Sequence, residues 1–559
     1  MNLFSIIYFY VFIFLSTIGY GYLFSKIFIK NYLKLNIGYH GLLGLIFLLF
    51  VSYSTNLFLP HTEKLNLLIH TIGILSFIIH LVTRFELLKK DLLISFLLLG
   101  LGLSGLIIFK THDDFPYYHL PYALTLVENK FIYGLGILNH GFKSPSSLFY
   151  LYSITYLPII KIYIVHSIPL LILLFSNLIL LEKIIGEKYL RKNQHAEYIK
   201  LFSIFSFIFI NIVFYRLAEH GTDRSGQIIF FLIIILLFEI LTKEKAITDE
   251  IKLLLILITF SITIKIYFIV NVIFLLLLIF NRHIREQLFR IILKDKITIF
   301  LCLLVIFSFH AMFASTACFL YPKEFSCLKN LIFSIKEAEI KALSPWFELW
   351  SKAGAAPNFK VQDPEIYVKG INWVPNWIDN YFFTKVSDTL GAIILMSIII
   401  VVSAKRKIKK RLKLKSFFYI YPFIILLFFE WFFGHPTLRY GGFAILALVI
   451  FLPISYLLFS KNFIIKTKTC YFLIFLTLII YNYRNIDRIN HEMKMYSKNN
   501  LKDPYFYVDD VKFTSKSYPE GITINKTIHG EMCWATPAIC GNHEIIKIKK
   551  NRGFIILYK

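Results

Sequence analysis

Charged side chains are scarce in this chain. Only 17% of its 559 residues are charged, and 34 are acidic. A typical soluble protein has about 25% charged and roughly 45–50% apolar residues, whereas 57% of this chain is hydrophobic. A soluble globule cannot bury that much apolar surface, but a lipid bilayer can surround it. The composition therefore excludes an ordinary soluble protein and predicts an integral membrane protein.

Several common sequence signals are also missing. There is no internal repeat, low-complexity tract or long flexible linker, and no cytoplasmic nucleotide-binding pattern. The glycines of 134–141 follow no predicted strand and precede no P-loop lysine, so they predict an interfacial turn. No signal-peptidase site follows the first apolar run, so 3–22 is expected to remain as a helix.

Long apolar runs occupy most of the chain, and about 20 apolar residues let a helix cross the hydrocarbon core. Such runs lie near 3–22, 38–59, 65–83, 92–109, 164–184, 198–216, 225–242, 297–314, 389–404, 417–433 and 440–459. The stretch 250–280 predicts two short helices joined near Lys265, and a last short span is expected at 468–481. The expected fold is an all-α polytopic membrane protein with roughly 12–14 transmembrane helices.

Lysine and arginine cluster between the apolar runs and give a formal net charge of +26. In a membrane protein such clusters mark cytoplasmic loops, so no nucleic-acid partner is expected. The densest cluster, 405–415, is placed in the cytoplasm. The other basic segments then fall on the same side: 26–34, 84–90, 185–197, 243–249 and 281–296.

The same alternation places the loops 110–145, 217–224 and 315–388 outside. It holds only if the ambiguous segment 146–162 does not fully cross the membrane. The predicted organisation is a polytopic membrane domain, 1–481, followed by a small extracytoplasmic region, 482–559, that mixes strand-like runs with turns.

The six cysteines agree with this topology. Cys302 and Cys470 fall within or at the end of apolar runs. The other four form two close pairs in segments predicted to lie outside, where an oxidising compartment would make them disulfides: Cys318 with Cys327, and Cys533 with Cys540. Neither spacing is typical of a zinc site.

The segment after the fourth predicted span is the most informative for chemistry. Asp113 and Asp114 are adjacent carboxylates, with His112 before them and His119 after them. Repulsion between neighbouring carboxylates can raise one pKa and favour base catalysis, and their oxygens could also bind a divalent metal. The alternative is a solvated loop in which Asp caps a helix and Pro116 occupies its first turn.

Basic side chains are expected at the same outer membrane face. They are Arg216 and Arg224 in one polar loop, Lys265 between two short helices, and His435 with Arg439 before a late span. Cations gathered there suit a phosphate or pyrophosphate group, which arginine can bind in a bidentate manner. The alternative is that each side chain reaches separately to lipid phosphate.

These motifs resemble those of the C-type integral membrane glycosyltransferases. Asp113 and Asp114 resemble the acidic motif of an early extracytoplasmic loop, although here it follows the fourth predicted span rather than the first. Arg216–Arg224 resembles the short outside loop, and Lys265 and Arg439 resemble basic positions near later helices. A closer likeness, to a bacterial branch of polysaccharide-associated membrane proteins, is carried by short segments: 118–121, 134–147, 318–327 and 533–537.

The resemblance implies transfer of a sugar from a polyprenyl-phosphate donor to a glycan or glycolipid acceptor. Asp113 or Asp114 would be the general base, and the basic residues and histidines would bind substrate. A divalent metal is optional, and membrane lipid is the remaining partner. The implied location is a bacterial inner membrane with the site facing outside. A polysaccharide polymerase, or a lipid-linked sugar transporter or flippase, is the alternative.

Overall fold

The computed structural model describes residues 3–186, 195–243, 247–355, 361–407, 414–498, 503–541 and 546–559. Within these ranges, ten helices are long and apolar enough to cross a membrane. They contain α1 (Leu3–Phe28), α2 (Ile37–Asn56), the first half of α3 (Glu63–Leu101), α7 (Ser167–Ile185), α9 (Ala196–Val213), α11 (Thr222–Thr242), α15 (Lys296–Thr316), α19 (Ser387–Ser403), α20 (Lys415–Gly434) and α21 (Phe443–Ser460). The prediction of a multi-pass helical membrane protein is confirmed, but the described residues contain ten such helices and not the roughly 12–14 expected.

The remaining helices connect or flank these spans. They are η1 (Tyr32–Lys34), α4 (Leu103–Leu106), η2 (Phe115–His119), α5 (Leu120–Glu128), η3 (Leu135–Ile137), η4 (His140–Lys143), α6 (Ser147–Ile154), η5 (Ile162–Ile164), α10 (Leu217–His220), α12 (Thr248–Ile264), η6 (Ile266–Phe274), α13 (Leu275–Ile279), α14 (Arg282–Lys294), η7 (Glu324–Ser326), α16 (Glu337–Lys352), α17 (Pro364–Tyr367), α18 (Val374–Trp377), η8 (Ile378–Val386), η9 (Leu438–Gly442) and α22 (Thr467–Met495).

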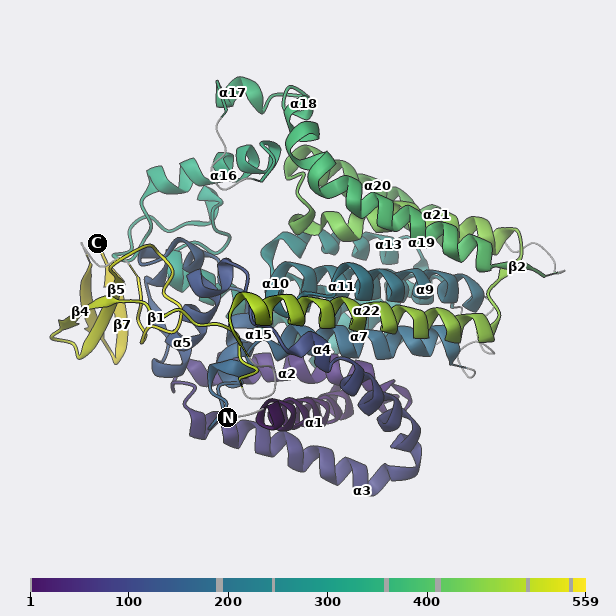
Figure 1. Ribbon diagram of the computed structural model, residues 1–559, viewed down its shortest axis with the longest axis horizontal. Helices are drawn as coiled ribbons and strands as arrows, with labels where there is room; N and C mark the ends of the chain where they lie inside the picture. The colour runs from purple at the N-terminus through teal and green to yellow at the C-terminus, as the bar shows by residue number, and fades with distance from the viewer. Residues whose placement is uncertain are drawn as a thin grey trace.

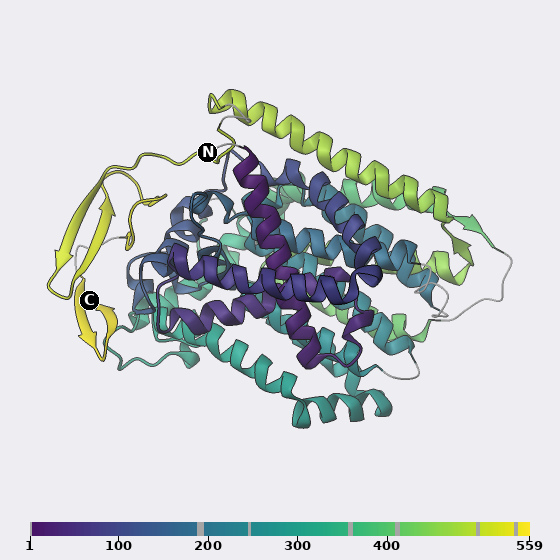
Figure 2. The ribbon, with the colours of Figure 1, turned by 90° about the horizontal axis from the view of Figure 1, so that it is seen from below.

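The helices form a bundle in which some are surrounded by others and some lie at the periphery (Figures 1 and 2). Every residue in the most apolar window of the span that ends in α7 is buried, and α11 is nearly as enclosed. By contrast, α3 and α20 bury only 28% of theirs. Helices that are apolar all round belong in a bundle core, whereas the exposed leucines and phenylalanines of α3 and α20 suit contact with acyl chains. Backbone groups in lipid must pair internally, and helices achieve this.

Several boundaries differ from those expected. The predicted spans 65–83 and 92–109 belong to one continuous helix, α3, up to Leu101. Likewise, α22 continues to Met495, beyond the predicted end at 481. Hydropathy marks where lipid contact ends, but charged residues such as Lys and Glu still favour helix, so the hydrogen-bonded helix continues.

Two other predictions about helices agree with the structure. The stretch 250–280 is divided at Lys265, where α12 ends and η6 begins. Segment 146–162 contains only the eight-residue helix α6, which is too short to cross a bilayer.

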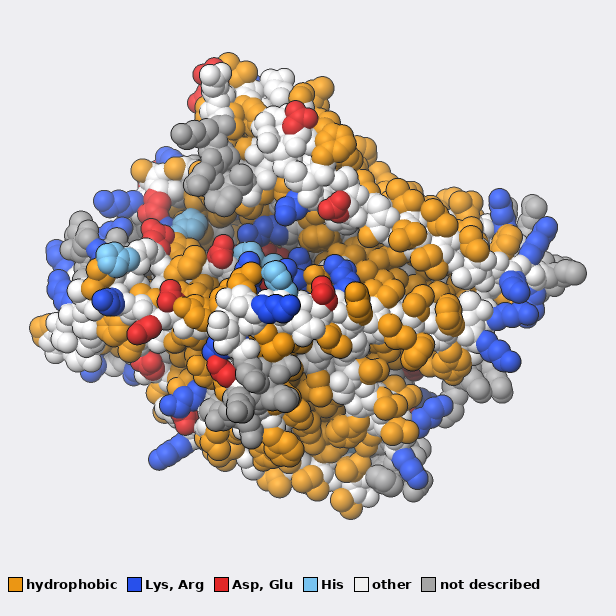
Figure 3. All heavy atoms as spheres, in the orientation of Figure 1, with side chains coloured by type: hydrophobic (Ala, Val, Ile, Leu, Met, Phe, Trp, Pro, Cys, Tyr) orange, Lys and Arg blue, Asp and Glu red, His pale blue; other side chains and the backbone are white. Residues whose placement is uncertain are grey.

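Segments predicted to be cytoplasmic meet at one end of the bundle. Asn31 donates to Asp249 over 2.9 Å, and the Lys252 ammonium pairs with Asp295 at 2.5 Å. Strand β2 (Lys405–Arg406) pairs with β3 (Phe463–Ile464) in antiparallel register. Figure 3 shows lysines and arginines gathered near this end, beyond an extensive apolar surface. Of the predicted basic segments, 187–194, 244–246 and 408–413 lie outside the described residues.

The opposite end carries the large loops and the C-terminal strands (Figure 1). Strands β4 (Phe513–Tyr518) and β5 (Ile522–Thr527) form one antiparallel pair, and β6 (Lys547–Asn551) and β7 (Phe554–Tyr558) form another. Strand β7 also pairs in parallel with β1 (Ile132–Tyr133). The C-terminal region therefore completes a small sheet with an early loop.

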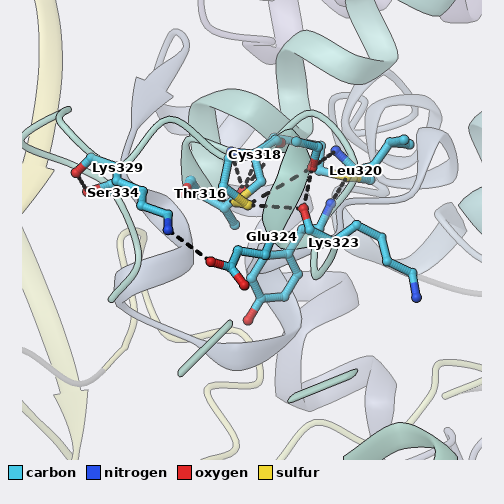
Figure 4. Close-up of a disulfide and its surroundings, with 11 residues drawn as sticks. Thr316, Cys318, Leu320, Lys323, Glu324, Lys329 and Ser334 are labelled. Carbon is cyan, nitrogen blue, oxygen red and sulfur yellow. Dashed lines mark hydrogen bonds and ion pairs between the residues drawn. A yellow bond between two sulfur atoms is a disulfide. The ribbon is translucent and has the colours of Figure 1, made fainter. Parts of the chain in front are cut away.

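Both predicted cysteine pairs are disulfide-bonded, and both lie at this end. The Cys318–Cys327 bond closes a short loop after α15, and Lys329, just beyond that loop, pairs with Glu324 inside it at 2.9 Å (Figure 4). The second bond, Cys533–Cys540, closes a loop after β5. Trp534 in this second loop contacts Pro116, close to the candidate site described next.

Candidate functional site

Asp114 and Arg439 meet at the loop-rich end of the bundle, although 325 residues separate them in sequence. Asp114 immediately precedes η2, but its carboxylate makes no capping hydrogen bond to that helix. Instead its Oδ2 accepts from Nη2 of Arg439 over 2.9 Å. The helix-cap alternative for this residue is therefore wrong, because the carboxylate is committed to a distant cation.

A second carboxylate extends this contact into a chain of alternating charge. Nε of Arg439 donates to Asp223 Oδ2 over 3.0 Å, and the Lys265 ammonium lies 3.1 Å from Asp223 Oδ1. Asp223 stands in the first turn of α11, and Lys265 in the break between α12 and η6. We call Asp114, Arg439, Asp223 and Lys265 the ion cluster; its two positive and two negative charges balance.

The turn that carries Arg439 is fixed from several sides. The amide of Gln227 donates to the carbonyls of Leu438 and Arg439, and its oxygen accepts from the Ala444 N–H. Gly441 has a φ of +81°, a left-handed conformation that glycine adopts at little cost. The Arg439 backbone is thus held in place before any substrate binds.

Indole and phenol groups hold the same turn from its other side. The Trp431 indole donates to the Thr437 carbonyl over 2.7 Å, and the Tyr381 hydroxyl accepts from the Leu438 N–H over 2.9 Å. The indole of Trp377 donates to the carbonyl of Pro436. Buried polar groups of this kind must be paired, so the aromatic residues both fill space and fasten the turn.

The charge state of Asp114 follows from its neighbours. Burial alone would raise the pKa of Asp114, but the positive charge of Arg439 outweighs burial, so its pKa lies below the usual value. Opposite charges within about 4–6 Å favour the ionised form. At neutral pH the group is therefore a carboxylate paired with Arg439.

The predicted histidines divide between the cluster and the core. Nδ1 of His112 accepts from the Asp114 N–H over 3.2 Å, and its ring lies 5.0 Å from that of His220. His119 is buried, with its ring 4.9 Å from that of Phe149. Burial, above all, lowers the pKa of His119 to about 3. His112 is placed to contact a ligand, whereas His119 is a neutral packing residue.

Three other predicted site residues have other partners and are not members of the ion cluster. Arg216 pairs with Glu219, and Arg224 packs 5.8 Å and 5.6 Å from two phenylalanine rings. Asp113 is exposed. The structure thus brings together Asp114, His112, Lys265 and Arg439 from the predicted set, and His435 stands nearby with its ring 5.7 Å from Tyr440.

A second charged group supports the segment that leads into Asp114. Glu492, on α22, accepts from the N–H groups of Phe109 and Lys110, and Arg488 donates to the Ile107 carbonyl over 2.7 Å. Arg488 also lies 3.5 Å from Glu219. These contacts hold segment 107–110, which leads to Asp114, against the bundle.

Sequence reasoning missed Asp223 and Gln227 as site residues. Asp223 lay within the polar loop that was singled out, but the two arginines there drew attention instead. Gln227 is the last polar residue before the apolar run of α11, and its side chain is buried. A buried polar side chain at the start of a membrane helix is a usable signal, because it needs a partner.

No group of three or more His, Cys, Asp and Glu side chains is placed to bind one metal ion within the described part of the chain. Asp113 and Asp114 do not form a joint pair of inward-facing carboxylates, since the first is exposed and the second is half-buried against Arg439.

A family model described as a domain of unknown function (DUF8201) matches residues 3–446. The chain belongs to the DUF8201 family. The matched region includes every member of the ion cluster, while the C-terminal strands β4 to β7 lie beyond it. No curated protein and no solved structure matches this DUF8201 chain.

Proposed function

We propose that the protein is a membrane glycosyltransferase that moves a sugar from a polyprenyl-phosphate donor to an extracytoplasmic glycan or glycolipid acceptor. The observation that carries the proposal is the Asp114 carboxylate, which leaves its own helix uncapped and binds Arg439 at the end of the bundle. Transfer from a phosphate leaving group needs a base for the acceptor hydroxyl and a cation for the leaving phosphate, and Asp114 and Arg439 can supply these two groups.

In the proposed reaction, an acceptor hydroxyl oxygen attacks the anomeric carbon of the donor sugar. Asp114 takes the hydroxyl proton as the new glycosidic bond forms. The bond between the anomeric carbon and the phosphate oxygen breaks, and the phosphate leaves with the electron pair. Arg439 and Lys265 stabilise the charge that develops on that oxygen. Asp114 then returns its proton to solvent.

Donor binding would also prepare the base. Arg439 lowers the pKa of Asp114 while the two are paired. A donor phosphate that binds Arg439 brings negative charge next to Asp114 and draws the guanidinium away. Both effects raise the pKa of the carboxylate, so the base strengthens when its substrate is present. Asp223 keeps Lys265 in place during this exchange.

The position of the polar groups favours an enzyme over a transporter. Asp114, Asp223, Lys265 and Arg439 all stand at helix ends or helix breaks on one end of the bundle. Transporters usually place their binding groups near the bilayer midplane on discontinuous helices. The polar loops and the basic loops at opposite ends of the bundle favour an outward-facing site; the bacterial inner membrane and the C-type glycosyltransferase fold are part of the same proposal and rest on the resemblance of the motifs.

The test is a transfer assay with purified full-length protein and a panel of polyprenyl-phosphate sugars, followed by release of the polyprenyl phosphate. We expect at least one donor to be consumed by wild type and not by the Asp114→Asn variant. Equal consumption by both proteins, or by neither with any donor, would contradict the proposal.

A further inference from the structure

A polar pocket of about 390 Å³ opens at the same end of the molecule, away from the ion cluster. One wall is the early loop, with Tyr117, Asn139 and Lys143; the other includes Glu531 from the C-terminal region. Helix α16 contributes Glu339, which pairs with Lys143. The pocket therefore exists only because the C-terminal region folds back on the loop that carries Asp114.

Tyr117 connects the pocket to the ion cluster. It lies three residues after Asp114, on η2, and lines the pocket. Burial, together with the nearby carboxylates of Glu531 and Asp114, raises the pKa of Tyr117 to about 12. The phenol is thus within electrostatic reach of both carboxylates. The backbone N–H of Trp534 donates to the Pro116 carbonyl over 3.0 Å, which fixes the pocket wall to the catalytic motif.

Helix α16 runs from the pocket towards the ion cluster. Glu339 lies at the pocket, and the ring of Phe347 is 6.2 Å from that of His140, another lining residue. Eleven residues after Glu339, the Trp350 ring is 6.3 Å from that of Tyr440, next to Arg439. At about 1.5 Å per residue, these two ends are on the order of 16 Å apart.

The surface between these ends is hollowed. Figure 3 shows a recess below α16 to α18, with basic and histidine side chains on its floor. Helix α16 carries aromatic rings beside this recess, where Trp346 and Trp350 stack with centroids 6.2 Å apart. Flat rings with polar neighbours present both apolar faces and hydrogen-bonding tips, a surface suited to sugar rings.

We propose that this pocket binds the far end of an extended oligosaccharide acceptor, whose reacting end lies at Asp114. The inference rests on the proposed function for the identity of that reacting end. Carboxylates, lysines and an amide line the pocket. Together they offer both hydrogen-bond donors and acceptors, which fits a ligand rich in hydroxyl groups. The pocket lies beside the segment that carries Asp114 and extends along α16 away from it, so an acceptor that reaches both is longer than one sugar ring.

Binding of short glycans to the full-length protein in lipid nanodiscs tests this assignment. The probes are maltotetraose, chitotetraose and mannotetraose, each compared with its monosaccharide by isothermal titration calorimetry. Glu531 is exposed, so the fold should tolerate a substitution there. Glu531→Trp places a bulky ring at the pocket, and Glu531→Gln removes only the charge. Asp510→Asn is the matched control, because Asp510 is an exposed acid of the same region that does not line the pocket.

We expect at least one tetrasaccharide to bind ten times or more tightly than its monosaccharide. Glu531→Trp should weaken that binding at least tenfold, Glu531→Gln should weaken it less, and Asp510→Asn should leave it unchanged. If no tetrasaccharide binds better than its monosaccharide, or Glu531→Trp binds like wild type, the pocket is not a glycan site.

The Asp114→Asn variant separates the two proposals. It should bind the tetrasaccharide normally, since Asp114 does not line the pocket, while losing transfer. Pocket binding without transfer of any donor by wild type would leave the glycan site standing and overturn the glycosyltransferase. If wild type transfers sugar and Glu531→Trp transfers it equally well to every acceptor, the glycosyltransferase proposal stands and the glycan site is overturned.

Discussion

Two neighbouring aspartates occupy different environments, and this difference sets the first prediction. Asp114→Asn should lower transfer about a hundredfold to ten-thousandfold, as expected when a general base is lost. Asp113→Asn should keep most activity, because that side chain is exposed. Both variants should insert and fold, since Asn preserves size. The measurement is the turnover rate of both variants with the donor identified in the panel. A larger loss for Asp113→Asn would show that Asp114 is not the base.

Acid should destabilise the protein partly through Asp114. The pKa of Asp114 is lower in the folded protein than the value of about 3.9 in an unfolded chain. Its contribution to stability is therefore fully present above about pH 4 and is lost as the pH falls through the folded value. Between pH 5 and pH 3, the melting temperature of wild type should fall further than that of Asp114→Asn. Asp113→Asn, as the control, should follow wild type. Parallel curves for all three proteins would contradict a stabilising pair between Asp114 and Arg439.

The planar guanidinium of Arg439, with its several donors, is predicted to be necessary for tight donor binding. Its Nε and Nη2 bind different carboxylates at the same time, which the single ammonium of lysine cannot reproduce. Arg439→Lys should raise the KM for donor about tenfold to a hundredfold, in line with roughly 1.5–3 kcal/mol for a charged hydrogen bond. Lys341→Arg, on the exposed side of α16, is a neutral control. An unchanged KM would mean that the arginine is only structural.

At this scale the sequence identified the kinds of residue but not their partners. The acidic pair, Lys265 and Arg439 stand out because charge is rare among apolar runs. Two features depend on contacts between residues hundreds of positions apart. They are the aspartate that turns inward and the position of Arg439 between two carboxylates. Arg224 shows the converse: its position suggested phosphate binding, but it packs between phenylalanine rings.

Among the elements, the disulfide loop of the C-terminal region offers a direct test. Trp534 within the Cys533–Cys540 loop binds the Pro116 carbonyl. Replacing both cysteines by alanine should destabilise this region by about 2–4 kcal/mol and lower transfer. Mass spectrometry of non-reduced peptides checks the bond, and a thermal shift checks the stability. Cys302→Ala is the control, because Cys302 is unpaired; four free thiols in wild type would contradict the bond and its outside location.

Helices were predictable where hydrophobicity alone decides them, and less so at their ends. The apolar runs located the spans of α1, α2, α7 and α11, and Lys265 marked the break after α12. The extension of α22 to Met495 was not predictable from hydropathy, since its polar end is stabilised by Arg488 and Glu492 contacts with a distant segment. The parallel pairing of β1 with β7 likewise leaves no local signal in a two-residue strand.

For the whole molecule, the orientation in the membrane is the leading prediction. A cysteine introduced at exposed Lys369, in the loop predicted outside, should react with a membrane-impermeant maleimide in intact cells. One at exposed Lys461, at the basic end, should react only after permeabilisation. The Cys302→Ala/Cys470→Ala background removes the two free thiols. The reverse labelling pattern would place the ion cluster in the cytoplasm and exclude an extracytoplasmic acceptor.

The pairing of β1 with β7 also sets an order of events during synthesis. The ribosome makes residues 132–133 long before it makes their partners at 555–556. At about 5–20 residues per second, the delay is roughly 20–85 s. Throughout that interval the early loop lacks both its strand partner and the loop that holds Pro116. A chain cut short after the last span would keep the ion cluster but lack these two contacts, so the segment around Asp114 is completed only when the last residues have been made.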